Sequence, residues 1–219
     1  MAIRRTVLSS IAACAAAAAL SPAFAANAAA DYPNRPIRLV VPFGAGGSTD
    51  MVARLLAEKM STVLGKSVVV DNKGGAGGSI GATEIAKAAP DGYTIGMATV
   101  STHGSNPAIF RKLPYDAIKD FAPITNVMSV PSVFVVNASV PAKTMKEFIA
   151  LAKANPDKYT FASPGTGSLG HANIENFMNL AGIQLLHIPY KGAGQAITDA
   201  LGGQVNAMTD NLPSTLPHI

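Results

Sequence analysis

At residues 37–50 the chain reads IRLVVPFGAGGSTD. The apolar, β-branched run at the start of this stretch is typical of a buried strand, and a helical pattern continues from its end to residue 64. The glycine loop between strand and helix places backbone N–H groups at the start of the helix, where the first amides lack helical acceptors and the macrodipole is positive. Such a loop predicts a site for a small anion.

A second stretch of the same kind lies at residues 159–181. YTFA at 159–162 leads into SPGTGSLG at 163–170, and a helical run is predicted from His171. The two loops are alike in composition but do not repeat a sequence. Two such loops in one chain predict a small anion that is held from two sides.

Short apolar runs alternate with helical patterns along the whole chain, and glycine or proline closes several of them. The predicted strands are 37–43, 67–71, 94–98, 132–137, 159–162, 185–189 and 205–209. The predicted helices are 50–64, 80–88, 145–154, 171–181 and 195–201. Most of the strands lack polar alternation, so we expect an α/β fold with parallel strands covered on both faces. We expect one crossing between two lobes, at 128–139.

The first thirty residues have the composition of a secretory signal peptide. Arg4 and Arg5 precede an alanine-rich apolar run, and small residues suit cleavage after Ala25 or Ala30, of which we prefer Ala30. Cys14, the only cysteine, lies in the apolar run, where a lipoprotein anchor is the alternative to an ordinary small residue. Cleavage downstream of it leaves a chain without disulfide or thiol chemistry.

Composition also limits the partners. The formal net charge is +4, two of the positive charges lie in the predicted signal peptide, and no cluster of Lys and Arg stands out. We therefore expect no nucleic-acid partner. The four histidines are scattered, so we expect no metal site. The first glycine loop lacks the third glycine of a dinucleotide fingerprint, so we expect no cofactor.

Enzyme motifs fit the loops poorly. Ser48 and Ser168 are the candidates for a secreted serine hydrolase, but neither has the Gly-x-Ser-x-Gly setting. GGAGGSIG at 74–81 is either a further glycine loop at a helix start or a tight, mobile turn. Lys191 is either a surface lysine or a positive charge for a bound carboxylate. We expect a binding protein that is not an enzyme, and we keep the serine hydrolase as the alternative.

In order and spacing, several motifs resemble those of the Bug-type solute receptors of tripartite tricarboxylate transporters. The matching stretches are VPFGAGGSTD at 41–50, NKGGAGG at 72–78, PDGYT at 90–94, LPYD at 113–116, SPGTGS at 163–168, PYKG at 189–192 and LGGQV at 201–205. The resemblance implies a two-lobed type II periplasmic-binding-protein fold, with a signal peptide at 1–30, lobe 1 at 31–130 and lobe 2 at 131–219. Members of that family continue well beyond residue 219, so we expect a C-terminally incomplete fold that binds its acid weakly.

The resemblance further implies a monomeric periplasmic receptor that binds a small organic carboxylate between its lobes and delivers it to membrane transporter subunits. The expected ligand-binding residues are Phe43, Gly44, Ala45, Gly46, Gly47, Ser48, Thr49, Asp50, Ser163, Gly165, Thr166, Gly167, Ser168, His171, Tyr190 and Lys191.

Overall fold

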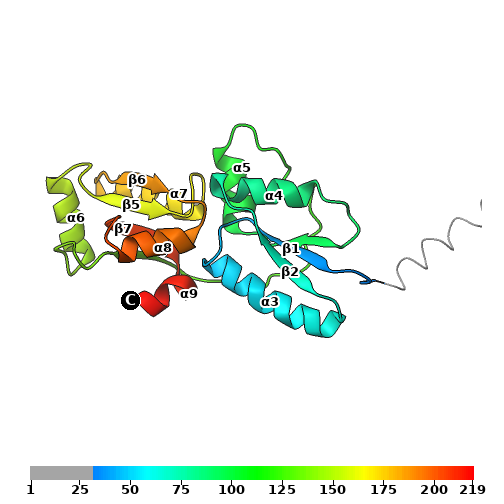
Figure 1. The fold of residues 1–219 in the computed structure, drawn as a ribbon. Helices are drawn as coiled ribbons and strands as arrows, with labels where there is room; N and C mark the ends of the chain where they lie inside the picture. Colours follow the sequence, from blue (N-terminus) through cyan, green and yellow to red (C-terminus); the bar gives the residue numbers. More distant parts are fainter. Residues whose placement is uncertain (1–31) are drawn as a thin grey trace, which may run out of the picture.

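The computed structural model describes residues 32–219, and the predicted signal peptide at residues 1–30 lies outside this range. The described chain forms two α/β units, each built around a sheet of its own (Figure 1). In residues 32–219, no helix combines the length and the apolar character that crossing a membrane requires.

The first sheet is wholly parallel, in the order β2-β1-β3. Its strands are β1 (Ile37–Val41), β2 (Val68–Asn72) and β3 (Thr94–Gly96), and its helices are α3 (Ser48–Leu64) and α4 (Ser79–Ala86). Alternate residues of β1, among them Ile37 and Leu39, pack on Ala53 and Ala57 of α3. Helix α4 lies on the other side of this sheet (Figure 1). The apolar run that opens the glycine motif is therefore a central strand covered on both faces.

The second sheet has the order β4-β7-β5-β6. Its strands are β4 (Ser132–Val136), β5 (Thr160–Ser163), β6 (Leu186–Pro189) and β7 (Ala207–Asn211), and its helices are α6 (Met145–Ala154), α7 (Leu169–Ala181) and α8 (Ala193–Leu201). Strands β5, β6 and β7 are parallel, whereas β4 runs antiparallel to β7. The prediction of parallel strands is thus wrong for β4. Two other strands and three helices lie between β4 and β7 in the chain, so the pair is not a single strand–helix–strand unit, whose strands are parallel.

Consecutive residues of β5 point into two different cores. Phe161 packs with Phe148 of α6 and Ile174 of α7, and all three side chains are almost completely buried. Ala162 packs on the opposite face, in a cluster that includes Ile197 of α8 and Met208 of β7. This alternation explains why the strand shows no polar positions, because both faces of the sheet are covered.

Several short elements, which the sequence analysis did not predict, complete the fold. They are η1 (Ala76–Gly78), η2 (Ser101–Ser105), α5 (Asn106–Ile109), α9 (Leu212–Thr215) and η3 (Leu216–His218). The chain leaves the first unit through an exposed segment at 122–129, close to the predicted crossing. Helix α9 lies beneath α8 of the second unit (Figure 1) and also touches the first unit, where Ser214 donates its amide to Ser48 Oγ of α3 (N···O 3.1 Å).

Candidate ligand site between the two units

Loops at the carboxyl ends of strands from both sheets meet where the two units touch. The amide of Gly44, after β1, donates to the carbonyl of Lys191, after β6 (N···O 2.9 Å). Elsewhere in this junction, the amide of Leu169 at the start of α7 donates to Ser101 Oγ (3.0 Å). Ligands of open α/β sheets bind beyond the carboxyl ends of the strands, and the junction has that position in both units.

Two helix N-termini without side-chain caps come together here. Helix α3 begins after Gly47 and helix α8 after Gly192, and neither residue offers a capping side chain. The two starts are close, since a Cβ built on Gly47 would lie 3.2 Å from the Cβ of Ala193. The amides of the first turns have no helical acceptor, and the dipoles of both helices are positive at these ends. The arrangement favours an anion between α3 and α8.

A hollow of about 210 Å³ opens at this point. It is lined by Gly44, Ala45, Lys191, Gly192 and Gln195. The Lys191 side chain is exposed, so its ammonium group supplies a solvated positive charge at the rim. The hydroxyl of Tyr190 donates to Asp199 Oδ2 (2.7 Å). Burial and this carboxylate raise the pKa of Tyr190 to about 12, so the phenol keeps its proton.

Asp50 holds the first glycine loop in shape. Its carboxylate accepts the amide of Gly46 (3.0 Å), Arg54 Nε (3.0 Å) and Asn72 Nδ2 (2.9 Å). Burial alone would raise the pKa of Asp50, but these hydrogen bonds outweigh it and hold the pKa below its usual value. The structure thus gives this predicted ligand-binding residue three partners within the protein.

Ser48 is buried at the start of α3 and belongs to a cluster of hydroxyl groups. Its Oγ lies 2.7 Å from Ser214 Oγ, which in turn donates to the carboxylate of Asp210. Burial raises the pKa of Asp210, against the opposing effect of these hydrogen bonds. Ser48 therefore ties α3 to the chain that follows β7, and a hydrolase substrate would have to displace this contact.

The second loop is also extensively hydrogen-bonded within the protein. Ser168 caps α7, because its Oγ accepts the amide of His171 (3.2 Å), and its side chain is buried. The amide of Gly165 donates to Ser163 Oγ (3.2 Å), and the amide of Gly167 donates to His171 Nδ1 (3.3 Å). Together with the amides of Gly44 and Gly46, four glycine amides that were expected to be available to a ligand donate hydrogen bonds within the protein. That expectation is wrong for these four groups.

The remaining predicted residues differ in exposure. Phe43 is buried, Thr49 is half-buried, and Ala45 and Thr166 are exposed. The structure brings the Phe43–Asp50 loop to residues 191–194 and the Ser163–Ser168 loop to Gly77 and Ser101. Each predicted loop thus contacts the other unit. Several of the residues that it meets there were not among the predicted ligand-binding residues.

Gly192 and Gln195, which line the hollow, are absent from the predicted ligand-binding residues, and so are Gly77, Ser101 and Asn106 of the same junction. Gly77 belongs to the glycine loop that was left open between a third loop of this kind and a mobile turn. A Cβ on it would lie 2.7 Å from the carbonyl oxygen of Thr166. Ser101 receives the amide from α7, and Asn106 donates to the Gly77 carbonyl (3.2 Å). Asn106 is fully buried, and its Oδ1 has no donor among residues 32–219. Only the glycines gave a sequence pattern that could have identified this loop.

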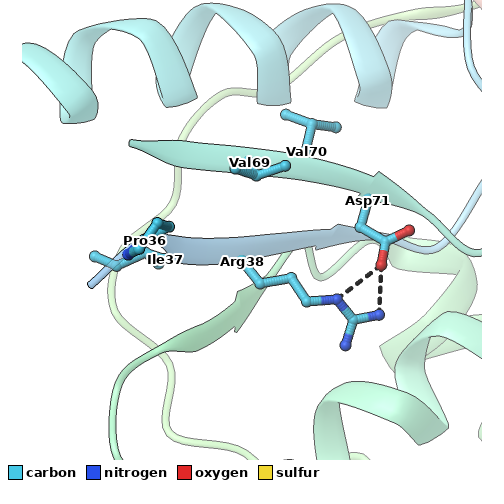
Figure 2. A pocket seen from close by; sticks show the side chains of 6 residues that line it. All are labelled: Pro36, Ile37, Arg38, Val69, Val70 and Asp71. Carbon is cyan, nitrogen blue, oxygen red and sulfur yellow. Dashed lines mark hydrogen bonds and ion pairs between the residues drawn. The ribbon is translucent and has the colours of Figure 1, made fainter. Parts of the chain in front are cut away.

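A larger, more open hollow of about 440 Å³ lies on the first sheet (Figure 2). It is lined by Pro36, Ile37, Arg38, Val69, Val70 and Asp71. Arg38 donates to Asp71 Oδ2 (2.7 Å) and to Glu84, and both contacts raise the pKa of Arg38. Asp71 also pairs with Lys73 (3.5 Å), so the two positive charges beside this hollow are already matched by the carboxylates of Asp71 and Glu84. The hollow between α3 and α8 is therefore the better anion site.

The fold is that of the two-lobed type II periplasmic binding proteins, as predicted. The sequence model of the tripartite tricarboxylate transporter family receptors matches residues 52–219. The chain belongs to this family, which confirms the resemblance. Protein BugT of Bordetella pertussis is 42% identical over 197 residues, which are 89% of this chain and 60% of BugT.

Solved structures agree with this assignment. The periplasmic binding protein BugD is 42% identical, with a TM-score of 0.82 over 86% of this chain and 62% of BugD. R. palustris Rpa4515 with adipate is 37% identical, with a TM-score of 0.81 over 85% of this chain and 62% of that one. MatC from Rhodopseudomonas palustris with bound malate is 35% identical, with a TM-score of 0.81 over 85% and 63%. The chain thus spans less than two thirds of the length of these relatives.

Proposed function

We propose that this protein is an extracytoplasmic receptor that binds a small organic carboxylate at the junction of its two units. The observation that carries the proposal is the meeting of two uncapped helix N-termini, those of α3 and α8, beside a hollow rimmed by Lys191. Relatives with bound adipate and malate support a carboxylate as the anion.

One carboxylate group would bind the first-turn amides of α3 and α8. The Ser163–Ser168 loop would form the second wall, toward the rest of the ligand. Hydrogen bonds to a charged acceptor contribute roughly 1.5–3 kcal/mol each. Three or four of them, less the cost of immobilising the acid, set an upper limit near micromolar affinity, which corresponds to about −8 kcal/mol.

The proposed domain organisation, export and partners are those that the sequence and its family resemblance predict. Residues 1–30 direct export to the periplasm and are removed, lobe 1 covers 31–130, and lobe 2 covers 131–219. The receptor acts as a monomer and delivers its acid to membrane transporter subunits. It needs no cofactor or metal and performs no catalysis.

Thermal shift with a panel of organic acids, including malate and adipate, tests the proposal. An acid at 100 times its dissociation constant should stabilise the protein by about 2.7 kcal/mol. The acid should be recovered chemically unchanged. Hydrolysis of an ester panel that is abolished in Ser168→Ala or Ser48→Ala would instead establish the hydrolase. Failure of every acid in the panel to raise the melting temperature would contradict the receptor.

A further inference from the structure

We infer that His187 is a positioning residue that fixes the Ser163–Ser168 loop through the hydroxyl group of Ser163. The inference rests on the proposed function, because this loop is one wall of the proposed carboxylate site. No sequence motif assigned a role to His187.

A chain of two hydrogen bonds links His187 to the loop. His187 Nε2 lies 2.7 Å from Ser163 Oγ, and Ser163 Oγ accepts the amide of Gly165 at 3.2 Å. The hydroxyl has one hydrogen, and the imidazole nitrogen is the acceptor in reach of it. We assign His187 the tautomer with its hydrogen on Nδ1, in which Ser163 donates to Nε2 and accepts from Gly165. The imidazole thereby holds the hydroxyl in the rotamer that receives the loop amide.

Aromatic packing holds the His187 ring in place. The ring stacks on Phe161 (centroids 4.6 Å apart, interplanar angle 14°), its partner in the parallel pairing of β5 and β6. The same ring also stacks on His171 (4.1 Å, 14°). His171 Nε2 lies 3.3 Å from Glu175, which leaves its Nδ1 to accept the amide of Gly167. The two stacked histidines therefore hold the two glycine amides of one loop.

The protonation state of His187 suits this role. Burial, and then the neighbouring His171, lower the pKa of His187 to about 4. The imidazole is therefore neutral at neutral pH, and in its Nδ1–H tautomer Nε2 accepts the hydrogen bond from Ser163. A charged ring would turn this nitrogen into a donor and would remove the acceptor from the chain of bonds.

Burial keeps the Ser163 hydroxyl from direct contact with a ligand. Ser163 is 0% exposed, so its hydroxyl cannot reach an external carbonyl, although a serine and a histidine at 2.7 Å resemble a nucleophile and its base. Gly165 has a φ of +137°, a conformation that side chains with a Cβ rarely adopt. A hydrogen bond that stabilises this backbone conformation is therefore useful, and the Ser163 hydroxyl provides it by accepting the Gly165 amide.

A double-mutant cycle tests the inference. His187→Phe keeps an aromatic ring in the stack and removes Nε2, whereas Ser163→Ala removes the hydroxyl. Solvent exchange of the Gly165 amide, followed by NMR in the protein without added acid, should accelerate about tenfold in each single variant. The double variant should match Ser163→Ala, because His187 acts only through that hydroxyl. The dissociation constant for malate should rise about three- to tenfold and show the same non-additivity.

Each outcome decides the point. Unchanged Gly165 exchange in His187→Phe, or equal acceleration by this change in the Ser163→Ala background, overturns the inference. A wild-type protein that binds neither malate nor adipate refutes the proposed function for these acids, while the exchange cycle still judges His187. If His187→Phe does not fold, the test uses the ring ¹⁵N resonances of His187, compared between the wild type and Ser163→Ala. Ser163→Ala should then shift the Nε2 resonance, and an unchanged resonance overturns the inference.

Discussion

Replacing Gly192 with alanine should push the two units apart and weaken ligand binding. Gly192 has a φ of 166°, which is extended backbone open to any residue, so alanine adds no backbone strain. Its Cβ would lie 2.5 Å from the amide nitrogen of Gly44 and 2.9 Å from the Gly44 Cα. These distances are roughly 1 Å short of ordinary contact, so the two loops must separate.

The cost has two parts. Separation breaks the hydrogen bond between Gly44 and Lys191, a net loss of about 0.5–1.5 kcal/mol. Overpacking of a tight contact adds about 1–3 kcal/mol. If carboxylate binding needs the two helix starts together, the sum of about 1.5–4.5 kcal/mol raises the dissociation constant by a factor of about 10 or more.

Calorimetric titration with malate measures this effect, and circular dichroism checks the fold. Gly202→Ala is the matched control at the opposite end of α8, where the added Cβ would lie 3.4 Å from the nearest atom, the Thr198 carbonyl oxygen. This control should bind malate like the wild type. A Gly192→Ala protein that is folded and binds within threefold of the wild type would refute the reasoning.

Three further predictions concern the second unit. Gly165→Val should abolish most carboxylate binding, because its φ is +137° and the new Cβ would meet the Tyr190 carbonyl at 3.0 Å; full affinity by calorimetry would disprove this. The pKa of His187 is lowered from 6.5 to about 4, so the unfolded chain binds the proton more tightly. The contribution of neutral His187 to the free energy of unfolding should therefore be fully present above pH 6.5 and fall by up to about 3 kcal/mol as the pH drops to 4. Urea unfolding measures this fall, which should be smaller in His187→Phe. Phe148→Ala should cost about 3–5 kcal/mol of unfolding free energy in the same assay, since Phe148 is 1% exposed, and a loss below 1 kcal/mol would contradict the core assignment.

Strand positions could be predicted because most of the strands are short apolar runs. The predicted run at 37–43 and the observed β1 share the same core residues, and β7 is displaced by only two residues from its prediction. The short helices α5 and α9 were missed for a physical reason. Each has proline in its first turn, which suits a helix start but in a sequence also resembles a breaker.

The candidate site was only partly accessible from the sequence. Asp50 and Arg54 are four residues apart in α3, so their ion pair could have been predicted from helix geometry, and with it the structural use of the Asp50 carboxylate. Ser163 and His187 are 24 positions apart, and only the pairing of β5 with β6 brings them together. The contact between Gly44 and Lys191 depends on how the two units meet, which no local pattern encodes.

The central claim is that a carboxylate binds where the starts of α3 and α8 meet. Titration of ¹⁵N-labelled protein with malate, and separately with adipate, tests it most directly through the resolved glycine amides. The account predicts saturable shifts of the amides of Gly44, Gly47 and Gly192, with Gly65 and Gly182 unchanged at the far ends of α3 and α7. Saturable shifts that spare the first three amides and appear instead around Arg38 would contradict it.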